Sequence, residues 1–228
     1  MKRANTNSVE HYEVIVIGAG VAGIYQIKRL ADLGKHATVL EAAGGLGGTW
    51  YNNRYPGARF DSESYTYGYS FSDELLEEWH WKEAFSGQPE NLRYLNHVAD
   101  KFDLHKYMQF NCRVEKAHWD DDKNLWRLTV SDGRILTCNF VIMALGLLSI
   151  PTLPRLEGMT NFKGHSFHTF DWPHEPINLS DKKVAIIGTG ATAIQIIGEI
   201  ADKVGDLTVF QRRPNWCAPL NNYEVSEA

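Results

Sequence analysis

The fold class of this 228-residue chain is indicated by one stretch near its start, Val14-Ile15-Val16-Ile17-Gly18-Ala19-Gly20-Val21-Ala22-Gly23. A continuous apolar run that ends at a glycine is typical of a strand buried on both faces of a parallel sheet. The three glycines have the spacing GxGxxG. The first permits a tight turn, the second lets a pyrophosphate approach the backbone, and the third lets the helix pack closely on the strand. The stretch therefore predicts the strand, turn and helix that open a dinucleotide-binding domain.

The residues that follow continue this unit. Apolar residues at helical spacing predict a helix over residues 21–33, ended by Gly34, and a second strand over residues 37–40. Glu41 follows that strand, 23 positions after Gly18, where an acid accepts hydrogen bonds from a ribose 2′-hydroxyl. Gly18, Gly20, Gly23 and Glu41 are thus candidate dinucleotide ligands. A glycine turn from another kind of α/β protein is the alternative, and the acid in place argues against it.

The middle of the chain contains further helix and strand patterns. After a glycine-rich aromatic segment over residues 44–71, helices are expected at residues 73–85 and 89–104. Strand patterns follow around residues 110–118, 126–130 and 135–145, with Asp132-Gly133 as a hairpin turn between the last two. Prolines and a glycine between residues 151 and 158 then predict a linker.

A second strand–turn–helix pattern begins after this linker. It consists of a strand at residues 183–187, the turn Gly188-Thr189-Gly190-Ala191-Thr192-Ala193, a helix at residues 194–201 and a strand at residues 207–210. We assign Arg212 and Arg213 to the offset from the first glycine that the acid has in the first unit. Guanidinium groups there suit a 2′-phosphate, which an acid would repel. A solvated strand end is the alternative explanation of the two arginines.

The contrast between an acid and two arginines assigns FAD to the first site and NADPH to the second. Two such sites in one chain imply hydride transfer from nicotinamide to flavin. The predicted fold class is α/β with two Rossmann-like dinucleotide-binding domains, the second truncated. The expected divisions are an FAD-binding domain at residues 1–150, a linker at residues 151–181 and an NADP-binding domain at residues 182–228.

Composition excludes several other function classes. The net charge is −5 and the basic residues are scattered, so nucleic acid is not an expected partner. The longest apolar run, residues 140–150, is too short to span a bilayer, and residues 1–11 lack the apolar core of a signal peptide. Cys112, Cys138 and Cys217 are widely separated, and their odd number argues against a disulfide framework. They form no CxxC pair, which disfavours a zinc site and a flavin disulfide reductase. We expect a cytoplasmic protein without a metal.

Two further segments resemble a known family. Phe162-Lys163-Gly164-His165-Ser166-Phe167-His168-Thr169-Phe170-Asp171-Trp172-Pro173 matches the FxGxxxHxxxWP fingerprint of Baeyer–Villiger monooxygenases at every fixed position. The segment from Gly47 to Asp61, GGTWYNNRYPGARFD, resembles the flavin-site loop of the same family. The resemblance extends from about Val14 to Pro219, which is nearly the whole chain.

This resemblance implies an oxidoreductase, a flavoprotein that inserts oxygen next to a ketone carbonyl. In the family NADPH reduces FAD, and the reduced flavin adds O₂ to give a C4a-peroxyflavin. Its anion attacks the ketone, and migration of one substituent yields an ester or a lactone. The expected partners are therefore a small ketone and O₂. The protein has to keep the peroxide anionic and shielded from water by preorganised electrostatics.

The resemblance also implies the roles of individual residues. Those expected to contact or flank FAD are Gly18, Gly20, Gly23, Glu41, Gly48, Thr49, Trp50, Asp61, Tyr67 and Val114. Those expected to hold NADPH are Gly188, Thr189, Gly190, Ala191, Thr192, Gln195, Arg212 and Arg213. Catalytic roles are expected for Asp61, which in the family orients an arginine, and for His168, in a linker that changes conformation. Asp61 as a turn residue and His168 as a packed linker histidine are the alternatives, and we favour the second of them.

The chain departs from the family in its length. Family members are much longer, and the resemblance implies that the rest of the NADP-binding domain, a returning C-terminal segment and the arginine partner of Asp61 lie beyond Ala228. Two interpretations stay open: a monooxygenase polypeptide, whether part of a longer enzyme or completed by another chain, and a non-catalytic remnant that at most binds FAD or NADPH. A two-stranded second sheet is expected to expose apolar side chains and an unpaired edge.

Overall fold

The computed structural model describes residues 9–226, which divide into two compact units. One unit comprises Met1–Tyr51 and Leu95–Ser149, and the other comprises Asn52–Tyr94 and Ile150–Ala228. Residues 1–8, which belong to the stretch without a signal-peptide pattern, lie outside the described part. Residues 52–94 are thus grouped with the C-terminal residues, which the sequence did not indicate, and the three domain ranges given above stay a prediction.

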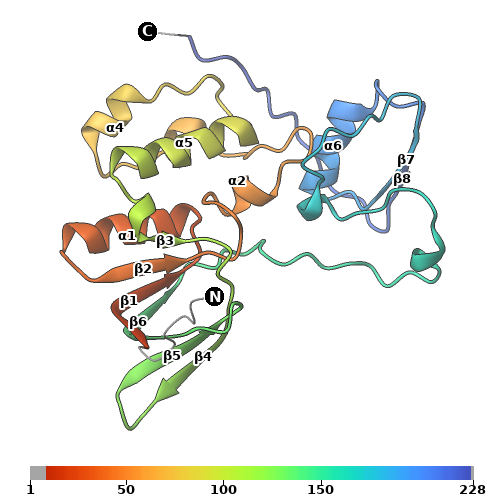
Figure 1. The fold of residues 1–228 in the computed structure, drawn as a ribbon. Helices are drawn as coiled ribbons and strands as arrows, with labels where there is room; N and C mark the ends of the chain where they lie inside the picture. Colours follow the sequence, from red (N-terminus) through yellow and green to blue (C-terminus); the bar gives the residue numbers. More distant parts are fainter. Residues whose placement is uncertain (1–8, 227–228) are drawn as a thin grey trace. The chain divides into compact units, whose positions relative to one another are not determined.

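The first unit is built on a six-stranded mixed sheet with the strand order β3-β2-β1-β6-β5-β4 (Figure 1). Its parallel part joins β1 to β2 and β6, and β2 to β3, whereas β4, β5 and β6 form an antiparallel meander. The strands are β1 (Glu10–Ile17), β2 (Ala37–Leu40), β3 (Met108–Gln109), β4 (Val114–Asp120), β5 (Leu125–Val130) and β6 (Ile135–Met143). Helix α1 (Val21–Asp32) packs against β1 and β2, and the short 3₁₀ helix η1 (His105–Tyr107) precedes β3.

The predicted opening of this unit is confirmed, because its apolar residues have the burial that the pattern required. Val14, Ile15 and Val16 of β1 are buried, and α1 buries Gly23, Ile24 and Ile27 on one face. Gly34 has a φ of +66° just after α1, the left-handed conformation in which glycine commonly ends a helix.

The antiparallel part is confirmed in type and corrected in extent. Gly133 has a φ of +86° and its N–H donates to the carbonyl of Val130 at 2.9 Å, which closes the predicted hairpin between β5 and β6. Strand β4 begins at Val114 rather than at residue 110. The reason is that Asn111 and Cys112 donate their backbone N–H groups to the carbonyls of Ala43 and Glu41 instead of pairing with β5.

The second unit begins with short helices around an aromatic cluster. Helices α2 (Thr49–Asn52) and α5 (Gln88–Lys101) cross the division between the units, and α3 (Ser64–Tyr67) and α4 (Asp73–Glu78) lie within the second. The helix predicted at residues 73–85 is wrong beyond Glu78, because Trp79 takes extended dihedrals. The rings of Trp81 and Tyr94 then lie 4.9 Å apart, so tertiary packing of the aromatic residues overrides the helical spacing.

The C-terminal half contains the second strand–turn–helix. Strands β7 (Lys183–Ile187) and β8 (Asp206–Phe210) pair in parallel, and α6 (Ala191–Ile200) lies between them in sequence. Before β7, the chain forms the 3₁₀ turns η2 (Met159–Asn161) and η3 (Thr169–Asp171). Ile187 and Phe210 are 61% and 56% exposed, which confirms the expected exposure of apolar residues on a two-stranded sheet. Among the described residues, no helix combines the length and apolar character needed to cross a membrane.

Candidate dinucleotide-binding sites

The two glycine turns have the same backbone geometry. Gly18 and Gly188 have φ values of +104° and +109°, which only glycine adopts readily. Gly18 donates its N–H to the carbonyl of Leu40, the last residue of the next strand, at 2.9 Å. Gly188 donates in the same way to Phe210, also at 2.9 Å. The chain thus builds one dinucleotide-binding turn twice, once in each unit.

The surroundings of the two turns differ. A Cβ on Gly23 would lie 1.8 Å from the carbonyl oxygen of Gly18, and a Cβ on Gly18 would lie 2.6 Å from that of Ala144. At the second turn, a Cβ on Gly188 or on Gly190 would meet no atom within 4 Å. The first turn is therefore closed around its own backbone, whereas the second has open space beside it.

Glu41 ties the first turn to the loop after β2. Its carboxylate accepts a hydrogen bond from the backbone N–H of Ala19 on one oxygen and from that of Ala43 on the other, both at 2.7 Å. The residue is buried, with 8% of its surface exposed. Because each carboxylate oxygen has two acceptor positions, both oxygens keep one for a ribose hydroxyl.

A second pair of glycines lies against the first turn. Gly47 donates its N–H to the carbonyl of Ala19 at 2.8 Å. Gly48, at a φ of +54°, approaches so closely that a Cβ on it would lie 2.8 Å from the Cα of Gly20. Backbone without side chains thus borders the N-terminus of α1, the place where the fold binds a pyrophosphate.

The other residues assigned to FAD divide between the units. Thr49 is exposed and Trp50 is buried in α2, and Val114 packs against the core of the first unit. Asp61 and Tyr67 belong to the second unit, where Asp61 is exposed and the ring of Tyr67 stacks on Phe60 at 4.6 Å. The first unit by itself therefore assembles the turn, Glu41 and Gly48, but not Asp61.

At the second turn, the residues after β8 hold the glycine loop. The Thr189 hydroxyl donates to the carbonyl of Arg213 at 3.2 Å, and the side-chain amide of Asn215 donates to the carbonyl of Thr189. Arg212 and Arg213 are both exposed beside this loop. Two guanidinium groups at this point can contact a 2′-phosphate and fit NADPH better than NADH.

Sequence reasoning missed the true counterpart of Glu41, which is Gln211. Like Glu41, it directly follows the strand and stands 23 positions after the first glycine, since 211 − 188 equals 41 − 18. Its side-chain amide lies 3.4 Å from the Thr189 hydroxyl. The equal spacing was the available signal, and a neutral residue there removes the repulsion that an acid would exert on a phosphate.

Two more predicted residues have protein partners. Gln195, in α6, accepts a hydrogen bond from the Tyr55 hydroxyl on its side-chain oxygen and donates one from its side-chain nitrogen to the backbone carbonyl of Arg59. His168 accepts the backbone N–H of Phe170 on Nδ1 at 3.0 Å and thereby caps the turn η3. This contact lies within the linker, and both interpretations of His168 stay predictions.

The cysteines form no disulfide among the described residues. All three are free, and Cys112 and Cys138 are buried. Burial raises the pKa of the Cys138 thiol to about 11, so it stays protonated at neutral pH. Among residues 9–226, no three histidine, cysteine or acidic side chains lie close enough together to hold a metal ion.

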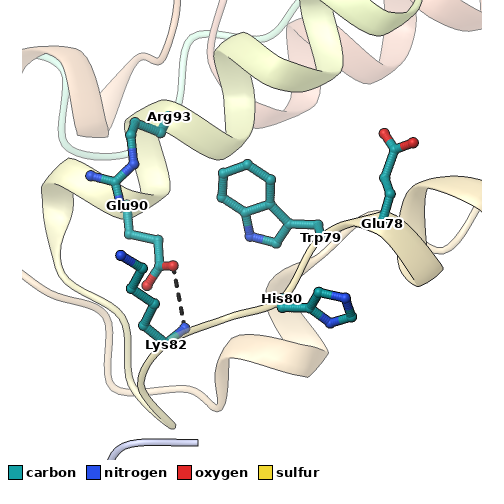
Figure 2. A pocket seen from close by; sticks show the side chains of 6 residues that line it. All are labelled: Glu78, Trp79, His80, Lys82, Glu90 and Arg93. Atoms are coloured by element: carbon teal, nitrogen blue, oxygen red, sulfur yellow. Dashed lines mark hydrogen bonds between the residues drawn. The ribbon is translucent and has the colours of Figure 1, made fainter. Parts of the chain in front are cut away.

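An open pocket of about 370 Å³ lies between the end of α4 and the start of α5 (Figure 2). In it the Glu90 carboxylate accepts the backbone N–H of Lys82 at 3.3 Å, as the dashed line in Figure 2 shows. The pocket is lined by Glu78, Trp79, His80, Lys82, Glu90 and Arg93. None of these is a predicted cofactor ligand.

Comparison with known proteins agrees with this geometry. Residues 15–226 match the family described as pyridine nucleotide-disulphide oxidoreductase. The chain is 44% identical over 221 residues to 2-oxo-Δ³-4,5,5-trimethylcyclopentenylacetyl-CoA monooxygenase of Pseudomonas putida, covering 94% of the chain and 41% of that enzyme. It is 41% identical over 226 residues to a Baeyer–Villiger monooxygenase of Pseudooceanicola batsensis, covering 98% of the chain and 41% of the relative.

Solved structures give the same result. The crystal structure of OTEMO in complex with FAD and NADP matches with a TM-score of 0.92 at 43% identity, over 96% of this chain and 42% of that one. The resemblance to Baeyer–Villiger monooxygenases is thus confirmed. The chain spans about 41% of the length of the curated relatives that it matches.

Proposed function

Because the chain belongs to the pyridine nucleotide-disulphide oxidoreductase family, we propose that it binds FAD at its first glycine turn and NADPH at its second. We propose further that it contributes these sites to a Baeyer–Villiger oxidation, in which O₂ and a ketone give an ester or a lactone. The observation that supports this most is the repeated turn, followed by Glu41 in one unit and by Gln211, Arg212 and Arg213 in the other.

At the first turn, the residues present fit FAD. The side-chain-free backbone at Gly20 and Gly48 leaves room for the pyrophosphate at the N-terminus of α1. Glu41 accepts the ribose hydroxyls on the acceptor positions that Ala19 and Ala43 leave open. These contacts orient the cofactor.

At the second turn, the residues present fit NADPH. Open space beside Gly188 and Gly190 admits the pyrophosphate, and the N-terminus of α6 faces it. Arg212 and Arg213 bind the 2′-phosphate, which gives preference over NADH. When bound, the two cofactors supply the hydride and the oxygen-reactive flavin on which this chemistry depends.

Asp61 and His168 have different roles in the proposal. Asp61 is exposed and carries a carboxylate for a cationic partner, as the family resemblance implies. His168 uses Nδ1 to cap η3, and only Nε2 remains for a proton. We therefore assign His168 to holding the fingerprint linker, and Asp61 to positioning a charge near the reacting atoms.

The test is flavin retention by the 228-residue chain. The chain is expressed, mixed with FAD and desalted, and its visible spectrum is recorded beside that of Glu41→Ala. We expect a retained flavin band near 450 nm (about, from flavin chemistry), reduced in the variant because the turn loses both the ribose acceptor and the contact to Ala19. NADPH, but not NADH, is then expected to bleach the band. A folded, colourless chain refutes the proposal.

A cytoplasmic location is also part of the proposal, supported by the three free cysteines. The proposal leaves the ketone unspecified. If flavin is retained but no ketone speeds NADPH oxidation, the chain binds its cofactors without turnover. That outcome supports the second interpretation, in which the chain is non-catalytic.

A further inference from the structure

Within the second unit, one side-chain amide of α6 holds the segment Tyr55–Arg59 at two points. The Tyr55 hydroxyl donates to Oε1 of Gln195 at 2.9 Å. Nε2 of Gln195 donates to the backbone carbonyl of Arg59, also at 2.9 Å. Gln195 therefore uses both its acceptor and its donor on this segment, which we call the docked loop.

The backbone of the docked loop also lies directly on the helix. Gly57 has a φ of +79°, and a Cβ on it would lie 2.6 Å from the carbonyl oxygen of Gln195 and 2.7 Å from Cγ of Glu199. Only a glycine fits at this distance and in this conformation. The close approach is independent of the two hydrogen bonds and indicates the same contact.

Other contacts hold the ends of the docked loop. The Arg59 guanidinium forms an ion pair with Glu83 at 2.8 Å and donates to the carbonyl of Phe85 at 3.2 Å. On the other side, Nε of Arg54 donates to the carbonyl of Trp172, in the linker fingerprint, at 3.2 Å. Ala58 also accepts the backbone N–H of Gln88 at 2.7 Å, so α6 is one of several elements that hold the docked loop.

The position of Gln195 in α6 connects this contact to the second glycine turn. Helix α6 begins at Ala191, at the second glycine turn, and Gln195 follows four residues later on the same face. The docked loop is the C-terminal half of the segment Gly47–Asp61, whose N-terminal half lies against the first glycine turn. A single stretch of chain thus contacts the first turn at one end and the helix of the second turn at the other.

We propose that Gln195 is a positioning residue that couples the second site to the flavin loop. NADPH bound at the turn Gly188–Gly190 restricts the motion of α6. The hydrogen bonds of Gln195 then restrict the motion of the docked loop and of the residues that lead to Asp61. The inference rests on the proposed function for its ligand, but not for the contact itself. It also changes the role of Gln195 from a direct NADPH ligand to a residue that acts through Tyr55 and Arg59.

The holding role is tested without any cofactor, by hydrogen exchange of backbone amides in the 228-residue chain. Gln195→Met keeps the length and helix propensity of the side chain but makes neither hydrogen bond. We expect exchange in residues 55–59 to accelerate on the order of thirtyfold, as loss of two hydrogen bonds worth about 1 kcal/mol each predicts, with the β1–β2–β6 sheet unchanged. Tyr55→Phe should have a smaller effect in the same residues.

Two features make this test specific. The double variant Tyr55→Phe/Gln195→Met should exchange no faster than Gln195→Met alone, because both changes remove the same bond. Gly198→Ala, on the same helix with no atom within 4 Å of the added methyl, is the matched control and should leave the loop unchanged. The holding role is overturned if residues 55–59 exchange as slowly in Gln195→Met as in the unaltered chain. It is also overturned if the effects of the two changes add in the double variant.

The coupling is tested by adding NADP⁺. In the unaltered chain we expect slower exchange both at residues 188–191 and in the docked loop, and in Gln195→Met at residues 188–191 alone. Protection of the turn without protection of the loop in the unaltered chain overturns the coupling and leaves the second site intact. No protection of the turn refutes the second site and the coupling together, while the holding role is still decided by the experiment without cofactor.

Discussion

Replacing Gly23 by alanine tests whether the first turn is as closely packed as the structure shows. The added Cβ would lie 1.8 Å from the carbonyl oxygen of Gly18 and 2.9 Å from its carbonyl carbon. Favourable contacts between such atoms need about 3.5 Å, so backbone has to move by more than about 1 Å. Overpacking of this kind costs about 1–3 kcal/mol and sometimes more, of which the better helix propensity of alanine offsets about 1 kcal/mol.

We therefore expect Gly23→Ala to lower the free energy of unfolding by roughly 2 kcal/mol and to abolish flavin retention. Urea unfolding followed by circular dichroism measures the first effect, and desalting after addition of FAD measures the second. Gly198→Ala is the control for propensity, since its methyl meets open space in α6, and it should stabilise the chain by up to about 1 kcal/mol. A Gly23→Ala chain as stable as the unaltered one, with flavin bound, would refute the packing argument.

Three further changes test other parts of the structure. Gly190→Ala places a methyl in space where no atom lies within 4 Å, so the free energy of unfolding should change by less than about 1 kcal/mol. NADPH binding, measured by calorimetry, should be lost because the methyl occupies the place of the pyrophosphate. Retained binding would contradict the assignment of the second site. Changing both Arg212 and Arg213 to alanine should lower affinity for NADPH by about tenfold or more and leave that for NADH unchanged, as loss of charged hydrogen bonds predicts. Tyr94→Phe leaves the buried N–H of Tyr69 without the acceptor it has at 2.7 Å, and should cost about 1–3 kcal/mol. Burial raises the pKa of Tyr94 to about 12, so its contribution is complete below pH 10 and lost as pH rises from about 10 to 12; unfolding curves over that range should converge for the two chains.

The elements that sequence predicted well depend on local pattern. Both strand–turn–helix units have their expected order, because the patterns that predict a buried strand, a glycine turn and a helix each involve only residues close together in the sequence. The errors lie where distant residues compete for the backbone. Asn111 and Cys112 pair with residues after β2, which delays β4, and Trp79 leaves the helical path for the aromatic cluster.

The same distinction applies to the sites. Glu41 was assigned from its spacing alone, and the structure adds that its carboxylate holds the turn. The pairing of Gln195 with Tyr55 was not predictable, because the two residues are separated by most of the chain and neither belongs to a spacing rule. Gln211 was overlooked because two arginines beside it gave a stronger signal than a neutral residue.

The carboxylate of Glu41 has a practical consequence for handling the protein. Two backbone N–H groups donate to this buried carboxylate, and these hydrogen bonds need no ribose. A cofactor could therefore leave the first turn while the Glu41 carboxylate keeps both backbone hydrogen bonds. If the first turn binds FAD as proposed, the flavin should be reversibly removable and replaceable by analogues of altered redox potential, which would make the first site a removable reporter group.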